Sequence, residues 1–103
     1  RICSVNDAGV SNKLNNRDYL FLSVPTAGSY TLEMSRVSGA ANTDPDFRVF
    51  DESNTFFSGS NSGDNNVETV TLSLESRNYF ISAFDFNNLS SPGQDSCYDF
   101  TVQ

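Results

Sequence analysis

Hydrophobic and polar residues alternate with a period of two over most of the chain from residue 19 onward. In the segment 30–35 the first, third and fifth residues are Tyr, Leu and Met, and the residues between them are Thr, Glu and Ser. Successive side chains of a β-strand point to opposite faces of a sheet, so this pattern predicts a strand with one buried face. Similar alternation predicts further strands at 19–24, 46–51, 69–74, 79–84 and 98–102, and a short apolar pair at Phe56 and Phe57.

Clusters of turn-forming residues separate these strands. The stretches 25–28, 38–45, 58–66 and 87–96 are rich in Pro, Gly, Ser, Asn and Asp, and they are predicted to form turns and surface loops. No segment keeps a helical period for more than one turn. The chain is therefore expected to be all-β, an antiparallel β-sandwich of about seven to eight strands. Residues 1–17 show no sustained period and are predicted to be an extended arm within a single domain, residues 1–103.

Composition narrows the functional classes. The 103 residues include thirteen acids, six bases and no histidine, and the net charge is −7. A nucleic-acid-binding surface needs a cluster of positive charge, so nucleic acid is not an expected partner. Without histidine there is no imidazole general base, no Ser-His or Cys-His dyad and no His-containing zinc site. No run of 18 apolar residues is present, so no membrane span is expected.

Two cysteines, Cys3 and Cys97, lie near the two ends of the chain. In an oxidising compartment they are expected to form a disulfide that ties the first segment to the last strand. A metal site built on two cysteines without histidine is the less favoured interpretation. The loop between them is long, and the chain-entropy model gives such a link an upper value of roughly 4.5 kcal/mol. The pair therefore indicates a secreted, extracellular protein.

Five sequence blocks, taken in order and spacing, resemble the bacterial pre-peptidase C-terminal domain. The blocks are DYLFLSVPTAGSYTL at 18–32, DPDFRVFD at 44–51, ETVTLSL at 68–74, NYFISA at 78–83 and YDFTV at 98–102. The resemblance spans roughly residues 18–102 and implies a jelly-roll-like β-sandwich. Domains of this family lie at the C-terminal end of secreted bacterial proteases, and the collagen-binding domains of collagenases are related to them. One departure from the family pattern is Arg77, which stands where the family usually has a glycine.

Acidic residues provide a candidate metal site. Asp44, Asp46 and Asp51 lie before and along one predicted strand, and Asp44 and Asp46 share its parity. Carboxylate oxygens are the ligands that Ca²⁺ prefers, and calcium is the one expected cofactor. The resemblance to the collagenase relatives implies that Asp7 of the arm could complete the site. The alternative is that Asp44 initiates a turn before Pro45 and that the other carboxylates are solvated.

Aromatic residues provide a candidate binding surface. Phe80, Phe84 and Phe86 share one parity, opposite to that of Tyr79 and Ile81, so one of the two sets could face outward. An exposed aromatic row could stack on a sugar or lie along a protein fibre. The alternative is a central strand buried on both faces, or packing of Phe84 and Phe86 beneath the 87–96 loop. The absence of tryptophan argues against the carbohydrate interpretation.

No catalytic constellation emerges from these residues, since a chain of this size offers little room for a deep pocket that would raise the pKa of an acid. The resemblance implies a non-catalytic accessory domain of a secreted bacterial protease, which assists substrate binding, secretion or localisation. Its expected partners are the catalytic protease domain of the same precursor and an extracellular protein fibre such as collagen. A carbohydrate-binding module and a purely structural spacer are the alternatives.

Overall fold

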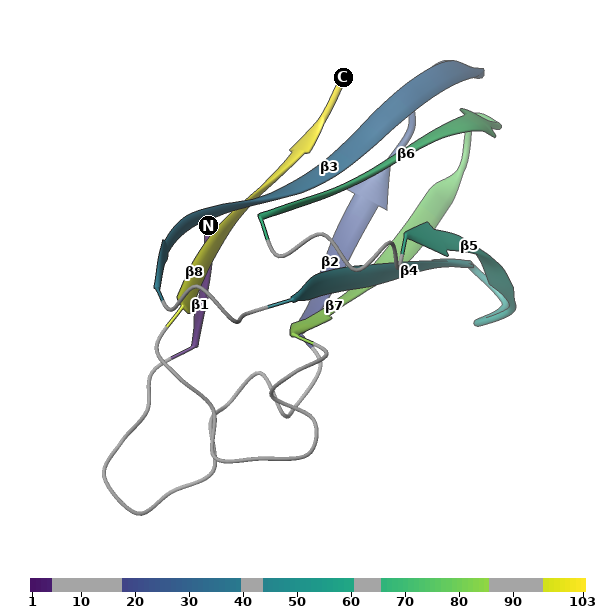
Figure 1. Cartoon of the computed structure of the whole chain (residues 1–103). Coiled ribbons are helices and arrows are strands. Elements are labelled where there is room, and N and C mark those ends of the chain that lie inside the picture. The colour runs from purple at the N-terminus through teal and green to yellow at the C-terminus, as the bar shows by residue number, and fades with distance from the viewer. Residues whose placement is uncertain (5–17, 40–43, 61–65, 86–95) are drawn as a thin grey trace.

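The computed structural model of the protein describes residues 1–4, 18–39, 44–60, 66–85 and 96–103 (Figure 1). Within these residues the chain forms eight β-strands and no helix. The strands are β1 (Ile2–Ser4), β2 (Asp18–Ser23), β3 (Gly28–Gly39), β4 (Pro45–Asp51), β5 (Phe56–Ser60), β6 (Val67–Leu74), β7 (Asn78–Asp85) and β8 (Ser96–Val102). The described part therefore contains no helix that could cross a membrane.

The strands build two antiparallel four-stranded sheets that pack face to face. Sheet A has the order β1-β8-β3-β6, and sheet B has the order β2-β7-β4-β5. The first strand pairs with the last, the second with the seventh, the third with the sixth and the fourth with the fifth. A long hairpin rolled up on itself gives this nested pairing, which is the arrangement of a jelly roll. The expected antiparallel β-sandwich is confirmed.

The core lies between the inner faces of the two sheets. The predicted inward residues of the strand 46–51, Phe47 and Val49, are fully buried and meet Leu32 and Met34 of sheet A. Tyr79 is buried as well, and its hydroxyl accepts a hydrogen bond from the Glu75 amide at 3.0 Å. Alternation of period two thus identified the buried face correctly, because it reflects strand geometry and not the identity of the partner strand.

Three strand segments differ from the sequence-based expectation. Residues Ile2–Ser4, expected within the arm, form β1, and β3 continues to Gly39 past a register shift between Arg36 and Ser38. Residues 58–60, expected in a loop, complete β5 opposite β4. Their small side chains suit a close approach: a Cβ at Gly59 would lie 2.6 Å from the Phe47 carbonyl oxygen. Residues 58–60 are therefore small because they pack tightly against β4, and not because they form a turn.

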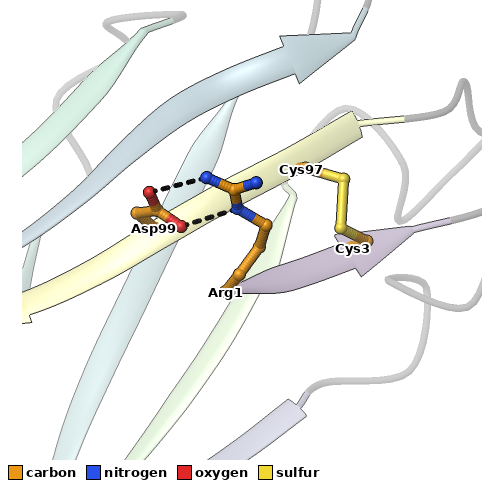
Figure 2. The surroundings of a disulfide bond; sticks show 4 residues. All are labelled: Arg1, Cys3, Cys97 and Asp99. Carbon is orange, nitrogen blue, oxygen red and sulfur yellow. Dashed lines mark hydrogen bonds and ion pairs between the residues drawn. A yellow bond between two sulfur atoms is a disulfide. The ribbon is translucent and has the colours of Figure 1, made fainter.

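A disulfide joins the first and last strands (Figure 2). Cys3 and Cys97 are directly opposite each other in the β1–β8 ladder, with Cα atoms 4.1 Å apart. Next to them, the Arg1 guanidinium donates two hydrogen bonds to the Asp99 carboxylate, at 2.9 and 3.1 Å. This hydrogen bonding holds the pKa of Asp99 below its ordinary value. The expected pairing of Cys3 with Cys97 is confirmed.

Candidate functional site

A row of four phenylalanines crosses the outer face of sheet B. Phe21 of β2 is opposite Phe80 of β7, Phe80 is opposite Phe50 of β4, and Phe50 is opposite Phe56 of β5. One phenylalanine from each strand therefore lies at the same level of the sheet, and we call this set the phenylalanine row. Because neighbouring strands are about 4.8 Å apart, the row is roughly 14 Å long.

The rings of the phenylalanine row are accessible to solvent. Phe21 is 63% exposed, Phe56 59% and Phe80 38%, whereas Phe50 is half-buried. The ring centroids of Phe21 and Phe80 are 5.7 Å apart with planes inclined by 63°, and those of Phe50 and Phe56 are 6.0 Å apart with planes inclined by 73°. Each pair thus meets edge to face, so the row is a ridged apolar surface and not a flat one.

Residues beside the row extend the aromatic surface. Tyr19 precedes Phe21 by two positions on β2 and is 66% exposed. On the neighbouring strands, Ser82 is buried, while Arg48 is exposed with its Cζ 5.7 Å from the centroid of the Phe84 ring. The outer face of sheet B therefore combines exposed aromatic rings with one cationic side chain.

The outer face of sheet A has the opposite character. Most of its outward positions carry hydroxyl or carboxylate side chains, namely Ser29, Thr31, Glu33, Ser35, Thr69, Thr71, Ser73, Asp99 and Thr101. The apolar exceptions are Val67, which is opposite Ser35, and the exposed Val37. The hydroxyls of Thr31 and Thr71 lie 3.0 Å apart across two strands and share a hydrogen bond. Two sheets of one small domain thus differ sharply in polarity, and the aromatic face is the one suited to binding an apolar partner.

The candidate aromatic residues from the sequence are placed differently by the structure. Phe80 lies in the phenylalanine row as an exposed residue, but Phe84 is only 3% exposed and is corrected to a buried residue. Phe84 is opposite Asp46 on β4, and the Arg48 guanidinium covers its ring. Phe86 lies outside the described residues. The sequence did not reveal Phe21, Phe50 and Phe56 as neighbours of Phe80, because the register between strands is not a local property.

An acidic cluster lies where β4 and β6 begin. One carboxylate oxygen from each of Asp44, Asp46 and Glu68 lies within 4.8 Å of the others. Asp46 is 5% exposed and Glu68 is fully buried. The Ser60 hydroxyl, at the end of β5, donates a hydrogen bond to Glu68 Oε2. The cluster therefore connects strands of both sheets and could hold a metal ion.

The cluster contains two of the four expected metal ligands. Asp44 and Asp46 meet as predicted, and Glu68 joins them from another strand. The sequence did contain a signal for Glu68: it shares the parity of the inward residues Val70, Leu72 and Leu74, so a carboxylate stands at a core position. Asp7 lies outside the described residues.

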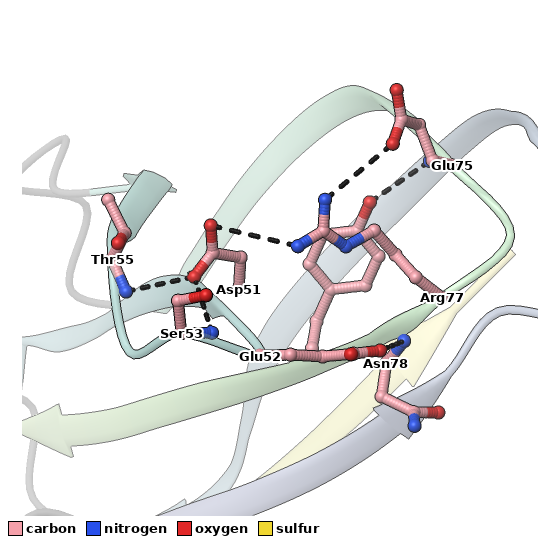
Figure 3. Close-up of polar contacts among 8 residues, drawn as sticks. Asp51, Glu52, Ser53, Thr55, Glu75, Arg77 and Asn78 are labelled. Carbon is pink, nitrogen blue, oxygen red and sulfur yellow. Dashed lines mark hydrogen bonds and ion pairs between the residues drawn. The ribbon is translucent and has the colours of Figure 1, made fainter.

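The structure corrects Asp51, which lies at the opposite end of β4. Its Oδ1 atom accepts hydrogen bonds from the amides of Ser53 and Thr55, both at 2.9 Å, and its Oδ2 lies 3.8 Å from an Arg77 nitrogen (Figure 3). Asn54, in the same turn, adopts a φ of 60°. Asp51 therefore stabilises the β4–β5 turn, which is the usual role of an aspartate that starts a turn.

Arg77 connects several turns at this end of the sandwich. Its guanidinium lies between Asp51 and Glu75, 3.6 Å from the Glu75 carboxylate, and its Cζ is 5.8 Å from the centroid of the Tyr79 ring (Figure 3). Its carbonyl accepts a hydrogen bond from the Val24 amide at 3.0 Å. The only non-glycine residue with a positive φ in the described chain is Asn54, so the backbone at Arg77 needs no glycine. Arg77 therefore stabilises this end of the sandwich through contacts to neighbouring turns, and the backbone freedom of a glycine is not needed there.

No protein-family model matches the chain, and no curated protein matches it.

Proposed function

We propose that this chain is a non-catalytic accessory domain of a secreted bacterial protease, of the kind that the pre-peptidase C-terminal domains provide, and that it binds an extracellular protein fibre through the outer face of sheet B. The phenylalanine row is the observation that carries this proposal. Aromatic residues exposed together on one face are characteristic of binding surfaces, and the hydroxyl-rich face of sheet A shows that the fold does not require them.

The size of the aromatic surface favours a weak, repeatable contact. The exposed parts of Tyr19, Phe21, Phe56 and Phe80 amount to on the order of 400 Å², at roughly 200 Å² per aromatic side chain. A stable protein–protein interface needs about 800 Å² from each partner. A fibre offers many equivalent positions, so several weak contacts can act together there.

The inclination of the rings favours a polypeptide over a sugar. A flat platform for several successive sugar rings has aromatic faces close to one plane, whereas the rings of the row are inclined by 63° and 73° within their pairs. The grooves between such inclined rings can accept apolar side chains of a polypeptide. Arg48 beside the row adds a cation that can pair with acidic groups or with carbonyl oxygens of a polypeptide.

Three features support the non-catalytic and extracellular parts of the proposal. The sequence has no histidine, and two pockets lined by residues that the structure describes measure about 220 and 160 Å³, below the roughly 300–1,000 Å³ of small-molecule sites. The Cys3–Cys97 disulfide is of the type that persists in oxidising compartments. A domain of this kind acts by placing an attached enzyme on its substrate.

Co-sedimentation with insoluble collagen and with other protein fibres tests the proposal. The variants Phe56→Ser and Phe80→Ser are expected to bind about tenfold more weakly, because each loses a large apolar contact worth more than 1 kcal/mol. Val37→Ser, which removes a 46%-exposed apolar residue from sheet A, is the matched control and should bind as the unaltered domain does. Retention of the row variants at unaltered affinity, or binding to no fibre at all, overturns the proposal; binding to a glycan array instead would identify a carbohydrate-binding module.

We also propose Ca²⁺ as the ion of the acidic cluster. Three carboxylates supply hard oxygen ligands, and Ca²⁺ tolerates the flexible geometry that side chains from β4 and β6 offer. A cation there would offset the mutual repulsion of the carboxylates and hold the two sheets together at this end. The ion would serve stability and not chemistry.

A further inference from the structure

The phenylalanine row is one residue wide and runs across the strands of sheet B. On one side of the row, the next outward level of β2 and β7 carries Ser23 and Asn78. On the other side, the next level carries Tyr19, Ser82 and Arg48. Levels two residues apart on a strand are separated by about 6.7 Å. The row is therefore a single file of phenylalanine rings, bordered by hydroxyl, amide and guanidinium groups.

The interval between the rings follows the interval between the strands. Each strand of sheet B contributes one ring, so the rings recur at the strand spacing of about 4.8 Å. The inclined rings place their centroids somewhat farther apart, at 5.7 Å for Phe21 and Phe80 and at 6.0 Å for Phe50 and Phe56. All four rings can contact one partner together only if the side chains of that partner repeat at nearly the same interval.

A cross-β fibril has this repeat. Its strands stack perpendicular to the fibril axis at about 4.7–4.8 Å, and their side chains form ladders parallel to that axis. Neighbouring ladders on one face come from residues two positions apart, so their centres are separated by about 6.7 Å and leave a groove between them. The phenylalanine row has the same interval along its length and is one side chain wide, so it matches such a groove.

A collagen triple helix matches the row less well. Its chains have a polyproline II conformation with a rise of about 3.1 Å per residue and a repeat of three residues, so equivalent positions recur about every 9 Å. The row presents two rings over that distance, and only one of them would meet an equivalent position. Because alternate rings would then add little contact, the row is better suited to the shorter repeat.

We propose that the fibre bound by the phenylalanine row is a cross-β fibril, with the row lying in a groove between two side-chain ladders. This inference rests on the proposed fibre-binding function and names its substrate class. Sheet B twists by roughly 20–25° per strand whereas a fibril is nearly flat, so the contact is limited to about four fibril strands. Arg48, one level beside the row, would face the next ladder and can bind carboxylate or amide oxygens there.

Co-sedimentation with fibrils of the peptide acetyl-Lys-Leu-Val-Phe-Phe-Ala-Glu-amide tests the inference. The peptide has no net charge and a continuous apolar segment, and a fibre-diffraction reflection at about 4.7–4.8 Å verifies the cross-β order of its fibrils. The domain should bind these fibrils more tightly than it binds an equal mass of insoluble collagen. The same peptide with alternate backbone nitrogens methylated stays soluble and should not release the bound domain. Release by this soluble peptide overturns the inference, because it shows that no ladder is needed.

Two variants of β2 separate the spacing of the rings from their apolar area. Phe21→Ser removes one exposed ring from the row. The double variant Phe21→Ser with Ser23→Phe keeps the ring on the same strand, at an exposed position about 6.7 Å outside the row. Both variants should bind the peptide fibrils about tenfold more weakly, because each lacks one of the four aligned rings. Binding of the double variant at unaltered affinity shows that apolar area alone is recognised, and it overturns the inference.

The collagen measurement separates this inference from the proposed function. Tighter binding to collagen than to the peptide fibrils, weakened by Phe80→Ser, overturns the cross-β assignment and leaves the fibre-binding function standing. Binding to neither fibre overturns both. Because Phe21 and Ser23 are exposed, the melting temperatures of their variants should equal that of the unaltered domain, and this measurement verifies that a loss of binding is not a loss of folding.

Discussion

Removal of the disulfide by the double replacement Cys3→Ser and Cys97→Ser should lower stability mainly through the unfolded state. The link joins residues 94 positions apart, and closing a loop of that length removes unfolded-state entropy worth about 4.5 kcal/mol. On the folded side, β1 adds only three paired residues, and Ile2 is its one buried apolar residue. The folded structure of β2–β8 therefore does not require the link.

The expected decrease in melting temperature is about 15–20 °C, since 1 kcal/mol corresponds to roughly 4 °C for a domain of this size. Thermal unfolding followed by far-UV circular dichroism measures it, and reduction of the unaltered domain with dithiothreitol is the control that should give the same value. The spectrum at 25 °C should keep its β-sheet form. A decrease below about 3 °C would refute the entropic argument, and loss of the β-sheet spectrum would show that folding itself depends on the link.

Three further predictions concern the acidic cluster, Gly59 and Asp99. If Kd is one hundredth of 10 mM, calcium at 10 mM in place of EDTA should stabilise the domain by about 2.7 kcal/mol and raise its melting temperature by about 10 °C. Asp46→Asn should abolish this rise, and coincident melting curves of the unaltered domain at constant ionic strength would exclude the ion. Gly59→Ala should lower the free energy of unfolding in urea by about 1–3 kcal/mol. Gly28→Ala, whose Cβ would meet only Tyr30 Cε2 at 3.7 Å, is the control and should change that free energy little. Equal effects of the two variants would disprove the close approach at Gly59. The pKa of the Asp99 carboxyl, measured by NMR, should lie below its ordinary value and should move back toward that value in Arg1→Gln. Because the pKa is lower in the folded state, the stability that the Arg1–Asp99 pair contributes is present above about pH 4 and is lost as the pH falls through the folded pKa.

The sequence predicted the features that depend on local geometry. Alternation around Phe47 and Val49 identified a strand and its buried face, because every strand presents alternate residues to one side whatever its neighbour is. The pairing of Cys3 with Cys97 was also accessible, since a chain with two cysteines allows one bond. β1 was not predicted, because three residues are too few to show a period and this strand is defined by β8.

The candidate site depended on register, which the sequence does not display. Phe21, Phe50 and Phe56 lie far apart in the chain and meet Phe80 only because the strands of sheet B align at that level. Phe84 has the parity of an exposed residue, but the Arg48 side chain covers it. Parity therefore assigns a side chain to a face, while its exposure depends on neighbours from other strands.

The nested pairing of the strands also determines when the fold can be completed. The β4–β5 hairpin needs only a short turn, and each further pair, β3 with β6, β2 with β7 and β1 with β8, encloses the one before it. The entropic cost of loop closure is lowest for the inner pairs, and it falls for each outer pair once the inner pairs have formed. A chain synthesised from its N-terminus must therefore hold Ile2 outside the core until its partner Tyr98, which lies on the last strand of the sandwich, has been made. Oxidation of Cys3 with Cys97 can then follow only after the outermost strand pair has formed, so the disulfide marks the completion of all four nested pairs and not of the inner ones alone.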